Sequence, residues 1–137
     1  MPKLSNFVYC EQTSPEENAI QSLNPLNVIT IESTPGRFSF SVVFSLVGFN
    51  PHEEHDGYIV FADPNGKTVI ETEKFTLEKE DHDKKNPILT GVSMGVEFNN
   101  VLLEVPGLFR TDLYFDNEKI GEFVIPVVTR EGVLRNE

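Results

Sequence analysis

Apolar and polar residues alternate with a period of two along much of this chain. The clearest case runs from Arg37 to Val47, where every second residue is apolar and serine fills three of the positions between them. The apolar positions are Phe38, Phe40, Val42, Phe44 and Leu46. Successive side chains of a β-strand point to opposite faces, so this segment is predicted to be a strand with one buried and one wetter face.

The same alternation recurs in shorter segments, which we interpret as further strands. They cover residues 6–11, 28–31, 58–62, 68–77, 92–105, 109–115 and 123–127. Within the segment 92–105 the apolar parity changes across Asn99-Asn100, which predicts a bulge or a turn at that point.

Turn residues separate these segments. In Asp63-Pro64-Asn65-Gly66 the proline presets φ and the glycine accepts a left-handed conformation, so a hairpin is predicted there. A corner is expected at Pro106-Gly107 and a tight turn over residues 116–119. Residues 50–57 are predicted to form a polar loop.

One segment has the signature of a short helix. Ser14 can cap it, Pro15 suits the first helical position, and Glu17 follows the cap by three residues as in a capping box. A short helix is therefore predicted near residues 15–23, with a plain loop as the alternative.

Together these elements predict an all-β fold: a two-sheet antiparallel β-sandwich of about eight strands. A β-barrel is the alternative. The length of 137 residues suits a single domain. We expect its core to span residues 6–128, with 129–137 as a C-terminal tail.

The charge is strongly negative, with 11 Lys+Arg against 22 Asp+Glu and a net charge of −11. Phosphate contacts dominate nucleic-acid binding, and a field of this sign opposes them. Binding to nucleic acid or to an anionic membrane is therefore not expected. We interpret the negative charge as favouring solubility. The alternative is that the protein is an acidic decoy that binds a basic partner.

Cysteine use and the N-terminal residues favour the cytoplasm. Cys10 is the one cysteine, so it has no internal disulfide partner, and it lies in an apolar run typical of a buried thiol. The first residues do not have the pattern of a signal peptide. No segment has the roughly 20 apolar residues of a membrane-spanning helix.

The closing segment, Val105 to Val128, resembles the last hairpin of bacterial immunoglobulin-like sandwiches. There a Pro-Gly corner leads into an aromatic residue, a strand, an acidic turn and a final strand. Phe109 stands where immunoglobulin-like folds often have a tyrosine.

The order of elements from about residue 6 to 128 also resembles that of an uncharacterised family of small bacterial and phage sandwich proteins. The shared features are an apolar first strand ending in Cys10, a long aromatic strand, the Asp63 to Gly66 hairpin and the closing hairpin. This resemblance implies a phage or mobile-element source and no catalytic residues.

Two clusters contain metal-ligating residue types. His52 and His55 lie three apart in the predicted loop, and His82 could join them if two loops meet. Imidazole and carboxylate ligands suit Zn, Ni or Fe, but this spacing differs from that of a His-Glu-x-x-His helix. We therefore favour a solvated turn and no metal. Calcium in an acidic end loop is a second candidate, with oxygens from Glu78, Glu80, Asp81 and Asp83.

No nucleophile elbow or glycine-rich phosphate loop is found, so no catalytic or cofactor-binding residue is assigned. The sequence favours a non-catalytic protein-interaction or structural module with an unknown protein partner. A metal-dependent enzyme using His52, His55 and His82 is the alternative from another class. A homodimer is expected through a sheet edge or face, since Ser39, Ser41 and Ser45 would form a flat, uncharged surface.

Overall fold

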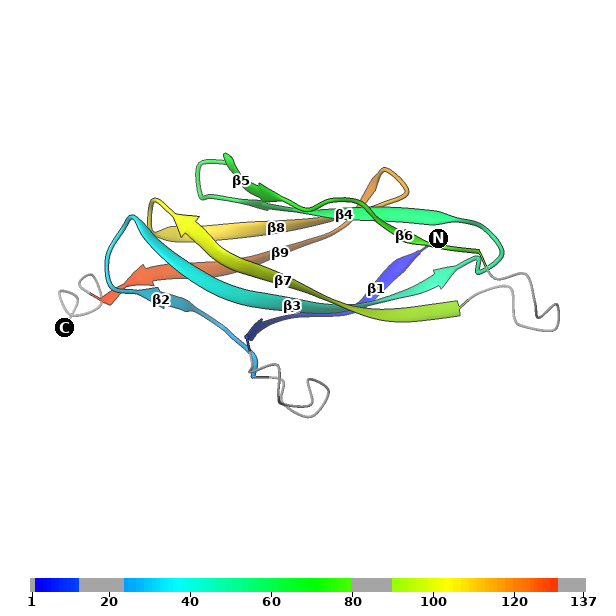
Figure 1. The fold of residues 1–137 in the computed structure, drawn as a ribbon, viewed down its shortest axis with the longest axis horizontal. Coiled ribbons are helices and arrows are strands. Elements are labelled where there is room, and N and C mark those ends of the chain that lie inside the picture. Colours follow the sequence, from blue (N-terminus) through cyan, green and yellow to red (C-terminus); the bar gives the residue numbers. More distant parts are fainter. Residues whose placement is uncertain (1, 13–23, 80–89, 131–137) are drawn as a thin grey trace.

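The computed structural model describes residues 2–12, 24–79 and 90–130. Within these ranges the chain forms nine strands arranged in two layers (Figure 1). They are β1 (Lys3–Glu11), β2 (Ile29–Ile31), β3 (Gly36–Phe49), β4 (His55–Ala62), β5 (Thr68–Glu71), β6 (Phe75–Leu77), β7 (Thr90–Leu103), β8 (Gly107–Phe115) and β9 (Glu118–Thr129).

The strands form two separately hydrogen-bonded sheets. Sheet A contains three strands in the order β1-β3-β7, and sheet B has the order β2-β9-β8-β4-β5, with β6 also paired to β4. Over the described ranges no ladder joins the two sheets, so the predicted two-sheet sandwich is confirmed. One pair departs from the antiparallel pattern, because β2 runs parallel to β9.

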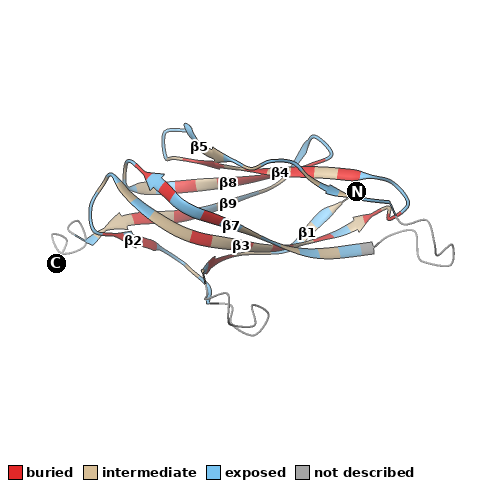
Figure 2. Ribbon diagram, in the orientation of Figure 1, coloured by how far each residue is buried: buried red, intermediate tan, exposed pale blue. Residues whose placement is uncertain are grey.

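The core lies between the sheets, and the alternation along β3 supplies much of it. Phe40, Val42, Phe44 and Leu46 are fully buried, while the serines between them are only partly covered. Sheet B contributes Phe61, Phe109, Leu113 and Phe115 to the same cluster. The buried stripes in Figure 2 follow this alternation along both layers. The predicted parity is therefore correct for the buried faces.

The parity change in β7 is a β-bulge. Phe40 lies opposite Phe98 and Phe38 lies opposite Val101, so Asn99 and Asn100 together face one residue of β3. Asn100 has a φ of 51°, which its short polar side chain tolerates. The bulge returns Val101 and Leu103 to the core, as their burial shows.

Both predicted hairpin turns are present. The amide of Gly66 donates to the carbonyl of Asp63 at 2.9 Å, and Gly66 has a φ of 86°. Between β8 and β9 the turn is only Asp116-Asn117, both with positive φ, while Glu118 and Lys119 already belong to β9. Such a two-residue turn matches the twist of the flanking strands.

Several boundaries differ from those predicted. β1 and β3 begin earlier, and β4 begins at His55, so the loop before it is shorter than residues 50–57. The predicted strand 68–77 is divided into β5 and β6, which pair with different parts of β4. The regular ladder ends at Thr72, between them. The Thr72 amide still donates to the carbonyl of Ile59, but the Ile59 amide donates to the Thr72 hydroxyl and not to its carbonyl.

The helix predicted near residues 15–23 lies outside the described residues, as does most of the charged run after Glu78. Of the residues that can be described, none belongs to a helix long and apolar enough to cross a membrane. Cys10 is buried and free, as predicted, and burial raises the pKa of its thiol.

Candidate functional site

The three histidines proposed as metal ligands have different positions. His55 is buried at the start of β4, His52 is exposed in the preceding turn, and His82 lies outside the described residues. The Nδ1 atom of His55 is 2.6 Å from a carboxylate oxygen of Asp116, and its Nε2 atom is 2.7 Å from the carbonyl oxygen of Asn50. Both ring nitrogens are therefore engaged, and no group of three metal-ligating side chains gathers within the described ranges.

The surroundings of His55 favour its charged form. A carboxylate and a carbonyl are both acceptors, so both ring nitrogens can donate only when the ring is an imidazolium. Burial lowers the pKa of His55, whereas its hydrogen bonds to Asp116 and Asn50 raise it. The nearby carboxylates of Asp116 and Glu53 raise it further, so the pKa lies above its ordinary value of 6.5. His55 thus ties the loop before β4 to the turn between β8 and β9.

This arrangement predicts a pH-dependent stability. When folding raises the pKa of a histidine, its protonated form stabilises the folded state. This stabilisation is fully present below the unfolded pKa of about 6.5 and is lost as the pH rises through the folded pKa. We therefore expect the Tm of the wild type to fall more steeply above about pH 6.5 than that of His55→Gln. Thermal unfolding from acid to mildly alkaline pH measures this. The exposed control His52→Gln should retain the wild-type dependence, and an identical slope in His55→Gln would contradict the assignment.

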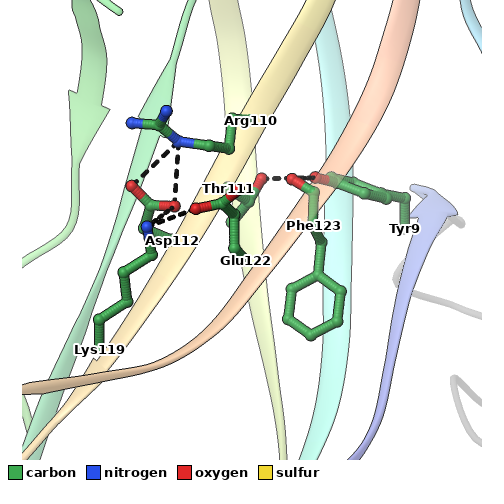
Figure 3. Close-up of polar contacts among 7 residues, drawn as sticks. All are labelled: Tyr9, Arg110, Thr111, Asp112, Lys119, Glu122 and Phe123. Atoms are coloured by element: carbon green, nitrogen blue, oxygen red, sulfur yellow. Dashed lines mark hydrogen bonds and ion pairs between the residues drawn. The ribbon is translucent and has the colours of Figure 1, made fainter.

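Tyr9 links the two sheets through the core. Its hydroxyl is 2.7 Å from the hydroxyl of Thr111 and donates to the carbonyl of Phe123 at 3.2 Å (Figure 3). Burial raises the pKa of Tyr9 to about 12, so the phenol stays neutral. These hydrogen bonds satisfy a buried hydroxyl and fix β1 against β8 and β9.

On the opposite face of β8, Asp112 is buried between two cations. Its carboxylate lies 3.1 Å from Arg110 Nε and 3.2 Å from Lys119 Nζ, and Lys119 also contacts Glu122 (Figure 3). Hydrogen bonds and ion pairs to these acids raise the pKa of Lys119. The cluster balances its own charges, so we interpret it as a structural network on the outer face of sheet B.

Of the calcium candidates, only Glu78 is among the described residues, and it is exposed just after β6. Glu80, Asp81 and Asp83 lie outside the described ranges.

The most unusual surface feature is the free edge of β7. This strand is paired to β3 on one side, and within the described residues nothing pairs with its other side. Its range Thr90–Leu103 spans 14 residues and includes Glu97 as its one charged residue. Natural proteins protect long edges with charges, proline, short strands or covering segments. Among the described residues, the Asn99-Asn100 bulge protects only one end of this edge.

The other sheet edges are better protected. The edges of sheet B are formed by β2, β5 and β6, which have 3, 4 and 3 residues. The outer side of β1 is partly covered, because the amides of Glu11 and Leu26 make hydrogen bonds that join it to the segment at Asn24. β7 is therefore the long open edge of the described structure.

Apolar side chains follow this edge on its inner side. Because β5 and β6 are short, the facing residues of β7 are only half-buried, as the tan and pale blue first half of β7 in Figure 2 shows. We call this strip between β7 and β5–β6 the seam. Its half-buried apolar residues are Val69, Ile70, Phe75, Leu77, Val92, Met94 and Val96.

A hollow lies at each end of the seam. The first, of about 330 Å³, is between β5 and the end of β7, with Arg37, Asp63, Lys67 and Glu104 among its lining residues. The second, of about 220 Å³, is between β6 and the start of β7. Its charged rim consists of Glu53 and Glu78, and its apolar lining includes Phe49, Pro51, Leu77 and Val92.

The described residues define an all-β fold of two packed sheets, with one long strand edge that none of them pairs with. A family profile matches residues 6–128, and the chain belongs to that family, which is a family of unknown function (DUF6941). The predicted membership in an uncharacterised family is therefore confirmed over the range where the resemblance was expected. No curated protein matches the sequence significantly.

Solved structures give only distant likenesses. Beta-glucosidase from Listeria innocua in complex with glucose is 11% identical with a TM-score of 0.49, over 93% of this chain and 16% of that chain. The alkylpurine DNA glycosylase AlkC of Pseudomonas fluorescens, bound to DNA with an abasic site analog, is 12% identical with a TM-score of 0.48. The match covers 93% of this chain and 30% of that chain. The glycosyl hydrolase family 2 member of Bacteroides cellulosilyticus is 17% identical with a TM-score of 0.42. The match covers 69% of this chain and 13% of that chain.

This chain thus spans less than a third of each of these proteins. All three TM-scores are below 0.5, and we draw no argument about function from them.

Proposed function

We propose that this protein is a non-catalytic interaction module in the cytoplasm, which binds an extended segment of a partner protein along the free edge of β7. In this mode the partner adds a strand to sheet A, and main-chain hydrogen bonds provide much of the affinity. The observation that carries the proposal is the open edge itself: a strand of 14 residues with one charge and no pairing partner in the described ranges.

The seam supports this proposal. An added strand would turn alternate side chains toward the sandwich, where they would meet Val92, Met94 and Val96 beside Phe75 and Leu77. These side chains are half-buried in the free protein, so binding would remove apolar area from water. Affinity and register would then both come from this one edge.

The alternatives have less support on the described surface. The metal-dependent enzyme needs free imidazole nitrogens, and those of His55 are engaged with Asp116 and Asn50. The acidic decoy needs an unbroken stripe of carboxylates, whereas the acids of the Asp112 cluster are interleaved with Arg110 and Lys119. The homodimer expected from the sequence stays a prediction. For the β7 edge we favour a partner protein, because the net charge of −11 opposes a second copy of the chain.

Proline substitutions at two successive positions of β7 test the edge. Successive residues of a strand direct their N–H groups to opposite sides, so one of Ser93→Pro and Met94→Pro removes a free edge donor while the other removes a donor to β3. We expect one variant to stay folded and the other to lose several kcal/mol of stability. The folded variant should fail to retain a partner that the wild type captures from the native host.

The matched control is Val124→Asp, which changes an exposed residue on the outer face of sheet B. It should capture the partner as the wild type does. Equal capture by the folded proline variant would refute strand addition at β7, and a wild-type dimer that this variant dissociates would identify a second copy as the occupant.

A further inference from the structure

We infer that the hollow bounded by Glu53 and Glu78 receives the side chain of a lysine or arginine carried by the strand that pairs with β7. This inference rests on the proposed function and adds the chemistry of the partner to it. Gly91 and Val92, at the start of β7, line this hollow. A strand added to the free edge would therefore pass its mouth.

The lining of the hollow suits a long cationic side chain. Its interior contains Phe49, Pro51, Leu77 and Val92, which can cover a hydrocarbon stem, and its rim holds two exposed carboxylates. Lysine and arginine bury their stems along apolar surface while the charged end stays near water and acids. The volume of about 220 Å³ is sufficient for one such side chain.

The charge of the hollow stays negative after His55 is included. His55 also lines the hollow, but its imidazolium is paired with Asp116 at 2.6 Å. Among the described residues no lysine or arginine lines the hollow, so the imidazolium of His55, which lies near Glu53, is the one cation there against two rim carboxylates. The hollow at the other end of the seam contains Arg37 and Lys67 with Asp63 and Glu104, and this balance of charges gives no preference for a cation.

The position of the hollow also predicts where the cation lies in the partner. All pairs within sheet A are antiparallel. A strand that continues this pattern runs opposite to β7, so its C-terminal residues reach the start of β7. The cationic residue is therefore expected near the C-terminal end of the bound segment.

A displayed library of random ten-residue peptides, selected on the full chain, tests this. Peptides rich in β-branched residues with Arg or Lys near the C-terminal end should be enriched. A synthetic peptide from the selection should bind about fivefold more tightly than its Arg→Gln counterpart, because two rim carboxylates each add a modest exposed ion pair. The double variant Glu53→Gln/Glu78→Gln should abolish this preference.

The control variant Glu71→Gln/Glu73→Gln changes the net charge equally but lies outside the hollow, and it should keep the preference. This inference alone would be overturned if the selected peptides bind the β7 edge without favouring a cation. It would also be overturned if their preference for a cation survives Glu53→Gln/Glu78→Gln. Peptides that bind equally well to the folded β7 proline variant, or no selection of extended peptides, would overturn the proposed function and this inference together.

Discussion

Phe40→Asp is expected to leave the protein unfolded. Phe40 is fully buried at the centre of β3, and its ring packs against those of Phe61 and Phe98. Removing a core phenylalanine costs about 3–5 kcal/mol, and an unpaired buried carboxylate costs several more. This approaches the whole stability of a typical domain, about 5–15 kcal/mol. Circular dichroism and urea titration measure the loss.

Ser45→Asp is the matched control, since Ser45 lies on the opposite face of the same strand. Its neighbours across the ladder are Asn6 and Ser93, which are neutral and can donate hydrogen bonds to a carboxylate. We expect a change within about 1 kcal/mol of wild type. Comparable losses in the two variants would contradict the assignment of faces.

Gly57→Ala is expected to destabilise the fold by about 1–3 kcal/mol. A Cβ at this position in β4 would lie 2.7 Å from the carbonyl oxygen of Tyr114 and 2.5 Å from the ring of Phe75. The Tyr114 oxygen belongs to the backbone of β8, which is paired to β4, so it cannot move without disturbing the ladder. Chemical denaturation measures the change in the free energy of unfolding.

Gly95→Ala is the control for this substitution. A Cβ at Gly95 meets only ordinary contacts, with the nearest atom, the carbonyl oxygen of Val42, at 3.9 Å. Alanine has less conformational entropy than glycine in the unfolded chain. The substitution should therefore be neutral or stabilise the fold by up to about 1 kcal/mol. A loss at Gly95 as large as that at Gly57 would show that the added methyl group is not the cause.

Local patterns were sufficient to predict the strands and most turns. The alternation in β3 follows from burial of one face of the strand. The Asp63 to Gly66 turn is determined by the four residues that form it. The Asn99-Asn100 bulge was also visible, because one inserted residue shifts every later apolar position. The division into β5 and β6 could not be predicted, since it involves a hydrogen bond from the amide of Ile59, on another strand, to the hydroxyl of Thr72.

The candidate site depended on tertiary neighbours that no local pattern contains. His55 was a metal candidate by residue type, but its partner Asp116 is 61 positions away. The open edge follows from the order of strands and from the shortness of β5 and β6, neither of which alternation predicts. One available signal was the low charge of residues 90–103, which is unusual in a chain with 22 acids.

The bulge in β7 marks the end of the regular part of its free edge. The ladder with β3 is regular from Gly91 to Phe98, between one irregularity at Gly48 and another at Asn99-Asn100. A strand continuing past Phe98 would meet a locally twisted backbone, and it would keep its inward and outward faces only by placing one residue opposite Asn99-Asn100, as β3 does. A segment of about eight residues can therefore match the regular part of the edge at about 3.4 Å per residue. A longer segment would have to cross the bulge before regular pairing resumes, so this edge suits a short linear motif better than a long run of β-structure.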